Sequence, residues 1–338
     1  MKSIKADTVK KVFLAALDRS STSRTALSND TGLSYVTVDR AVEFLLQENI
    51  LKQSYSSKSA VIERRSRMLS PKLHHWIAVY EILPDRFSFY MVDISLRAFK
   101  SFSYKPEDSI FIDDLLRQLI SKSSSFAKKF ARTESCIGSA ILLCGDYDPI
   151  TDKASDSPIY HLPAVKIKEF FSENGFNSVI DVYSVYSAFA KAQRESISKD
   201  EAVYSLFFDK GSLHSSYILP NGPIHINDLS HLPVSSGSTF ARVMNRIPDP
   251  DLIFPDLCNM LYMLISTVKV TKITVCDMLY SNPNTVCAVI KYIMIEKYSD
   301  RIPIPEIVPI DISKDSIRFI SREIRNRWFF EKILTDKG

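Results

Sequence analysis

Side chains suited to reading DNA gather in one short stretch of the sequence. This set carries two hydroxyls, a phenol, an apolar group and a guanidinium, and consists of Ser34, Tyr35, Val36, Thr37 and Arg40. Hydroxyl and guanidinium groups hydrogen-bond to base edges and phosphates, and apolar groups contact the thymine methyl. The stretch therefore predicts contact with double-stranded DNA through the major groove, with Ser34 on the phosphate backbone and the other four residues facing bases.

The residues around this stretch predict the elements that hold it in place. We expect a first helix from Arg24 to Thr31, and Gly32 in the tight turn that follows, where a positive φ is needed. Ser34 is expected to cap the second helix through its hydroxyl. The inner face of that helix is predicted from apolar residues at i, i+3, i+4 and i+7, namely Val38, Ala41, Val42 and Leu45. This is the pattern of a helix-turn-helix.

The negative charge of Asp39 opposes this interpretation, because it would repel phosphates beside the proposed contacts. The segments before and after the helix-turn-helix support the interpretation. Asp7 to Leu17 is predicted as a third, amphipathic helix. Lys52 to Met68, with a serine-rich middle, is predicted as a β-hairpin wing whose Lys52, Arg64 and Arg65 contact phosphates. A solvated linker with incidental charges is the alternative for this segment.

Charge and composition limit the possible partners. The 338 residues carry a net charge of +4, and residues 1–70 alone hold 12 basic and 7 acidic residues. The positive charge thus belongs to the segment that would meet a polyanion. We expect no membrane span, because no apolar run is long enough. The five cysteines form no CxxC pair, so we expect buried thiols in the cytoplasm and no metal site.

Glycine is scarce, with 8 residues in the whole chain and none spaced as GxG or GxxxxGK. Phosphate-binding loops need such glycines so that backbone N–H groups can approach the anion. The sequence therefore predicts no ATP or dinucleotide cofactor bound through a loop of this kind.

Beyond residue 71 the pattern alternates between strands and helices, which is typical of an α/β domain. Strands are predicted at 76–80, 87–94, 139–144, 178–182, 203–209, 215–219 and 272–276. Helices are predicted at 113–130, 165–174, 184–194, 255–268, 285–297 and 314–334. Residues 145–149 are predicted as a turn.

Taken together, the chain resembles the ROK family of sugar-responsive repressors and sugar kinases, which have the actin-like ATPase fold. The resemblance rests on the helix-turn-helix and on four later segments: Arg64-Arg65 with Leu69-Ser70, Asp181 to Lys191, Pro220 to Gly222, and Asn227 to His231. It implies a two-lobed domain in which Asp228 and His231 contact a sugar. A structural turn with polar residues is the alternative for that pair.

The catalytic features of the family's kinases are missing from the matching positions. Val182 and Tyr183 stand where the kinases have a sugar-binding Asn and a general-base Asp. Tyr80 to Pro84 lacks the Asp and Gly of the first phosphate loop, and Gly211 to Ser215 keeps one glycine of the second. The family's cysteine-rich zinc motif is absent. The resemblance therefore implies an inactive kinase-like domain.

These observations predict an N-terminal winged helix-turn-helix at 1–70 and a degenerate ROK-like domain at 71–338, with lobes at about 71–180 and 181–338. The predicted function is a dimeric, DNA-binding repressor that responds to a sugar or sugar phosphate and has no enzyme activity. Two alternatives stay open: a sugar kinase with atypical loops, and a protein-interaction scaffold that has lost DNA binding.

Overall fold

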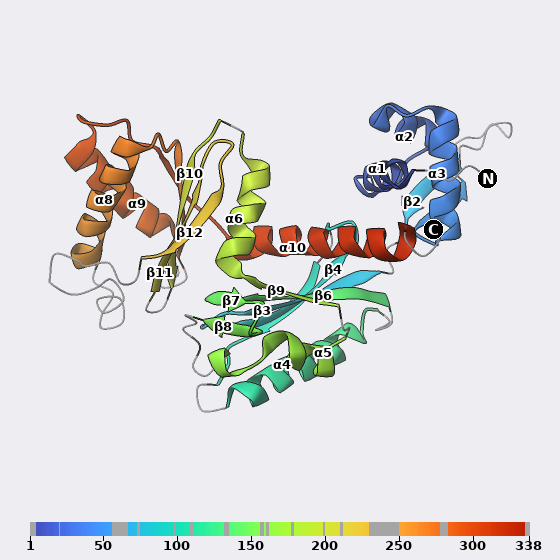
Figure 1. Cartoon of the computed structure of the whole chain (residues 1–338), viewed down its shortest axis with the longest axis horizontal. Helices are drawn as coiled ribbons and strands as arrows, with labels where there is room; N and C mark the ends of the chain where they lie inside the picture. Colours follow the sequence, from blue (N-terminus) through green and yellow to red (C-terminus); the bar gives the residue numbers. More distant parts are fainter. Residues whose placement is uncertain are drawn as a thin grey trace.

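The computed structural model describes most of the chain and arranges it along one long axis (Figure 1). The described residues are 5–19, 21–55, 67–72, 75–97, 99–107, 111–131, 135–155, 159, 162–176, 179–198, 200–209, 212–229, 250–277 and 283–334. None of the helices in these ranges combines the length and the apolar character that crossing a membrane requires.

The N-terminal unit, called the head here, comprises residues 5–72 and packs three helices against a two-stranded ribbon. Its elements are α1 (Ala6–Leu17), α2 (Arg24–Thr31), α3 (Tyr35–Gln47), β1 (Leu51–Tyr55) and β2 (Arg67–Pro71). The ribbon is antiparallel, with Leu51 opposite Pro71. The apolar faces of α1 and α3 are buried as their spacing predicts, and Phe13 and Val38 are fully inaccessible.

The rest of the chain, called the body, begins with a five-stranded sheet. Its strands lie in the order β5 (Phe99–Tyr104), β4 (Phe87–Asp93), β3 (Trp76–Ile82), β6 (Cys136–Leu143) and β9 (Ile180–Ser184). The first three strands form an antiparallel meander, and β6 and β9 run parallel to β3. The connections contain α4 (Ile112–Ala127), β7 (Asp146–Asp148), β8 (Lys153–Ser155), η2 (Leu162–Ala164) and α5 (Ile167–Asn174).

The second five-stranded sheet repeats the arrangement of the first. Its order is β12 (Ile224–Asp228), β11 (Ser212–Ile218), β10 (Val203–Asp209), β13 (Lys272–Asp277) and β14 (Glu306–Pro309). Again three antiparallel strands are followed by two parallel ones. Helices α8 (Pro250–Thr267) and α9 (Pro283–Tyr298) cover its outer face (Figure 1). Helices α6 (Val185–Ser196) and α10 (Ile312–Trp328) follow the last strand of each sheet.

Strand β3 is buried on both faces, because helices cover both sides of the first sheet. Side chains of a strand alternate between faces, so Ile77 and Val79 pack toward α10, whereas Ala78 and Tyr80 pack toward α4 and α5. The continuous apolar run in this strand follows from that double burial.

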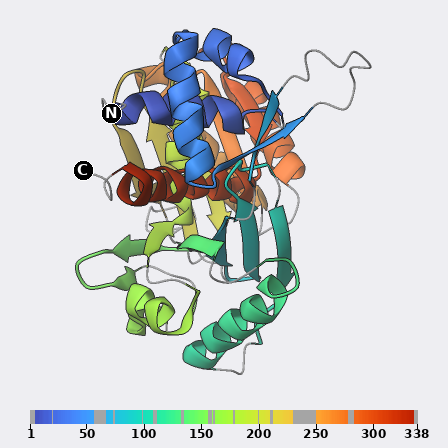
Figure 2. The same cartoon turned by 90° about the vertical axis from the view of Figure 1, so that its right-hand side faces the viewer.

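Helix α10 returns from the second sheet, crosses the first and ends against the head (Figures 1 and 2). Its π-helical continuation η3 (Phe329–Leu334) places Phe329 on Phe13 of α1, with ring centroids 4.2 Å apart and planes 8° from parallel. Lys10 lies over the ring of Phe330 at 4.6 Å. Arg97 of the body donates to the Leu17 carbonyl at 2.8 Å. Head and body therefore share one apolar core.

The structure of the body differs from the sequence prediction mainly at the edges of its two sheets. Strands β5, β12 and β14 were not predicted, and each lies at or near a sheet edge with short or polar sequence. Residues 146–148, predicted as part of a turn, form β7 and pair with β8. The expectation of buried thiols is confirmed, because all five cysteines are free and buried. Burial raises the pKa of Cys136 to about 11 and that of Cys258 to about 12.

Candidate nucleic-acid interface

The turn between α2 and α3 is built from local hydrogen bonds. The Ala26 amide donates to the Ser23 hydroxyl at 3.1 Å, which caps α2. At the other end of α2, Thr31 donates to the Leu27 carbonyl and Ser28 to the Leu33 carbonyl, both at 2.6 Å. Gly32 ends the helix in the left-handed region with φ of 65°. Each of these features agrees with the predicted helix-turn-helix pattern.

Replacing Gly32 by alanine is expected to lower the free energy of unfolding by about 1 kcal/mol, because a Cβ at positive φ is strained. No atom lies within 4 Å of the added Cβ, so the loss reports backbone strain alone. Urea unfolding measures it. Gly32→Asn should lose less, since asparagine tolerates this region. Equal stability of wild type and Gly32→Ala would remove the strain argument.

The N-terminus of α3 is exposed to solvent, as reading a groove requires. Ser34 caps it by accepting from the Thr37 amide at 3.3 Å, and the two hydroxyl oxygens lie 2.8 Å apart. The side chains of Tyr35 and Val36 are 53% and 61% exposed. Arg40 is exposed one turn further along, whereas Thr37 is half-buried. Four of the five predicted residues at this helix end are therefore accessible to solvent, and Thr37 is partly so.

Arg24, which the sequence interpretation missed, organises the charges on α3. Its guanidinium is 7% exposed and donates to Asp39 at 2.6 Å, to Gln53 of β1 at 3.1 Å, and to Glu43. Asp39 was expected to repel phosphates, but in the structure its charge is paired with Arg24. Glu43 is paired in the same way. The only sequence signal was the i, i+4 spacing of the two carboxylates.

Of the predicted wing at 52–68, the structure describes residues 52–55 and 67–68, which belong to the paired strands β1 and β2. Lys52 lies on β1, opposite Ser70 of β2, and is exposed. Its neighbour Gln53 turns inward and accepts from Arg24, so the wing and α3 are held together. Arg64 and Arg65 lie outside the described residues. Lys52 is thus the one predicted phosphate contact of the wing that the structure positions.

The predicted sugar contacts are described only in part. Asp228 is the last residue of β12 and pairs with His214 of β11. His231 lies outside the described residues. The two are therefore not brought together in the described part of the chain.

Side chains from both sheets fill the junction between them. This cluster is buried and consists of Leu83, Cys144, Val185, Tyr186, Phe189, Phe207, Cys276 and Ile312. Tyr186 stacks on His214 with centroids 4.4 Å apart, and its hydroxyl lies 2.9 Å from the Cys144 sulfur. Tyr186 and Phe189 are buried in this cluster, whereas Tyr183, at the end of β9, is half-buried. Tyr80 to Leu83, the position matched to the first phosphate loop, is buried strand and turn.

The duplicated sheets, each with a terminal helix, also occur in solved structures. A ROK family transcriptional regulator, described as a homologue of the E. coli MLC protein, matches with a TM-score of 0.64 over 97% of this chain and 99% of its own, at 12% identity. The chain has the fold of ROK family proteins. No family model and no curated protein matches the sequence.

Two further ROK structures match a smaller share of the chain. A ROK family protein from Streptococcus pneumoniae TIGR4, in complex with sucrose, has a TM-score of 0.53 at 12% identity over 76% of this chain and 99% of its own. A ROK family glucokinase from Streptomyces griseus, in complex with glucose and AMPPNP, has a TM-score of 0.51 at 12% identity over 75% and 99%. The ROK fold thus carries both regulators and sugar kinases.

Proposed function

We propose that the protein is a DNA-binding transcriptional repressor. In this proposal residues 1–70 are a winged helix-turn-helix, and residues 71–338 are a kinase-like body with lobes at about 71–180 and 181–338. The observation that carries the proposal is the exposed N-terminus of α3, where Tyr35, Val36 and Arg40 face solvent while the neighbouring carboxylates are paired with Arg24. A helix presented in this way fits the major groove.

The comparisons support the proposal, because the solved regulator matches a larger share of this chain than the other two ROK structures do. The ROK regulator matches 97% of the chain, whereas the sucrose-bound protein and the glucokinase match about three quarters. A regulator of this kind acts as a dimer, because two heads about one helical turn apart read a two-fold operator. We place it in the cytoplasm, where five free thiols are stable.

Replacing Arg40 by alanine is expected to weaken specific DNA binding by about 1–3 kcal/mol and to relax the sequence preference, because a base contact is lost. Fluorescence anisotropy with a selected genomic fragment measures both effects. Arg301→Ala is the matched control, since Arg301 is exposed in the turn after α9, in the body. Equal losses in the two variants would assign Arg40 to nonspecific attraction.

We propose that the body is not an enzyme, and we expect it to bind no ATP. The reason is that Tyr186, Phe207 and Leu83 fill the junction between the two sheets. Thermal unfolding with ATP, sugars and sugar phosphates tests this, since a ligand of the native state raises the midpoint. We expect no shift with ATP, and a shift with one sugar or sugar phosphate would identify the effector. ATP-dependent phosphorylation of a hexose would replace the proposal with the sugar kinase.

A further inference from the structure

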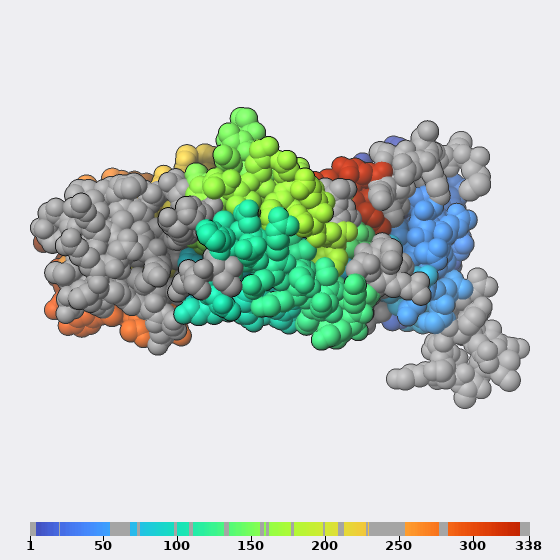
Figure 3. Space-filling view, turned by 90° about the horizontal axis from the view of Figure 1, so that it is seen from below, coloured from blue at the N-terminus to red at the C-terminus, as the bar shows by residue number. Residues whose placement is uncertain are grey.

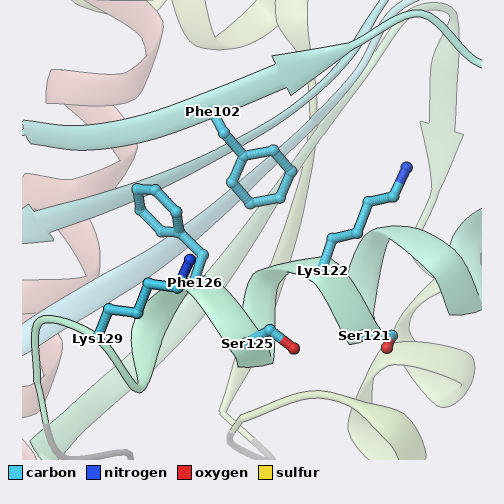
Figure 4. Close-up of a pocket in the computed structure, with 6 residues that line it drawn as sticks. All are labelled: Phe102, Ser121, Lys122, Ser125, Phe126 and Lys129. Atoms are coloured by element: carbon cyan, nitrogen blue, oxygen red, sulfur yellow. The ribbon is translucent and has the colours of Figure 1, made fainter.

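A shallow surface hollow of about 280 Å³, called the cavity here, lies between the edge strand β5 and helix α4 (Figure 4). In Figure 3 the surface of α4 lies near the middle of the molecule and the head at one end. The cavity is lined by Phe102, Ser121, Lys122, Ser125, Phe126 and Lys129. Five of these six residues share one stripe of α4 and the turn that follows it, because they recur at helical spacing.

Three pairs of side chains join β5 to α4 and the turn that follows it, in and beside the cavity. Phe102 contacts Phe126, with ring centroids 5.2 Å apart. On one side of this pair the Lys122 ammonium lies 3.7 Å from the centre of the Tyr104 ring. On the other side Lys100 lies 3.8 Å from the centre of the Phe130 ring. Both cations are thus held against aromatic rings at set positions.

The charge of this surface is positive and unbalanced. Neither residues 99–105 nor residues 117–131 contain an aspartate or glutamate, and together they hold six lysines and arginines. Within the described part of the chain, Lys122 and Lys129 form no ion pair. The phenol of Tyr104 is neutral at pH 7 and cancels none of this charge, and burial raises its pKa further, to about 12.

Lysines on an edge strand also discourage pairing with other sheets, and that role accounts for Lys100 on β5 and Lys105 just after it. It does not account for Lys122 and Lys129, which lie on and just after the neighbouring helix. Figure 4 shows these two side chains on either side of the phenyl pair, with their ammonium groups above the helix. Their position indicates a ligand rather than edge protection.

We propose that this cavity binds a phosphomonoester that carries a planar ring, such as a nucleoside or aryl monophosphate. The ring packs on Phe102 and Phe126, which lie between the two lysines, and the phosphate reaches one ammonium group at the edge of the phenyl pair while the other adds to the positive field. A phosphomonoester has a charge near −2 at neutral pH, which two lysines balance, whereas a carboxylate balances only one. The volume admits one ring system and one phosphate.

Isothermal titration calorimetry of the full chain tests the site with AMP, phenyl phosphate, adenosine and inorganic phosphate. AMP or phenyl phosphate should bind at least tenfold more tightly than adenosine or inorganic phosphate, because only they use both parts of the site. Lys122→Gln and Lys129→Gln should each weaken binding about fivefold. Lys128→Gln is the matched control, since Lys128 is exposed beside Lys129 but does not line the cavity.

Two results would overturn the assignment. One is that neither ring-bearing phosphate binds more tightly than inorganic phosphate. The other is that Lys128→Gln weakens binding as much as Lys129→Gln, which would indicate general attraction of anions. The site does not depend on the proposed DNA-binding function, and Arg40→Ala should leave its affinity unchanged.

Discussion

Phe329→Ala is expected to lower the free energy of unfolding by about 3–5 kcal/mol, which is the usual cost of removing a buried phenyl ring. Phe329 is 1% exposed and stacks on Phe13, which is fully buried. The loss should fall mainly on the contact between head and body, because α10 and α1 meet there. Chemical unfolding measures the total, and limited proteolysis should show faster cleavage between the two parts.

Phe330→Ala is the control for this prediction. Phe330 is the next residue, is 36% exposed and contacts Lys10 through its ring. Its replacement should cost less than about 1 kcal/mol, since a partly exposed cation–π pair contributes little. If Phe329→Ala were no more destabilising than Phe330→Ala, α10 would not anchor the head.

Arg24→Met is expected to remove specific DNA binding at physiological salt and to destabilise the head by about 1–3 kcal/mol. The guanidinium is buried and holds Asp39, Glu43 and Gln53. Its loss leaves two negative charges on the helix that we propose to meet phosphates, and releases β1 from α3. Anisotropy titrations and urea unfolding separate the two effects.

The triple variant Arg24→Met, Asp39→Asn, Glu43→Gln makes this prediction specific. It removes the freed charges, so it should recover much of the nonspecific affinity that Arg24→Met loses. A DNA affinity unchanged by Arg24→Met would show that charge pairing on α3 does not matter. A triple variant as weak as Arg24→Met would assign the loss to misfolding of the head.

The helices of the head were predictable because their signals are local. Ser23, Gly32 and Ser34 mark helix ends by short-range hydrogen bonding and backbone geometry, and the structure places the helix ends there. The buried face of α3 follows from spacing alone. The central strands and the longer helices of the body were also predictable, because the strands are continuous apolar runs and the helices have amphipathic spacing.

The remaining features depend on contacts between distant residues. Strand β14 has four residues and β5 alternates with serine and lysine, so only pairing with a neighbour defines them. The pairing of Arg24 with Asp39 spans 15 residues and requires α2 to pack across α3. The spacing of apolar residues in α10 predicts a helix. It does not predict that this helix packs against the head.

The measurement that tests the central claim most directly is retention of genomic fragments by the intact protein over a series of salt concentrations. The proposal predicts that a few fragments with two-fold related half-sites are retained against competitor DNA, and that log affinity falls linearly with log salt. Retention of no fragment above background at about 50 mM salt, where phosphate contacts are strongest, would contradict the account and favour a scaffold that no longer binds DNA.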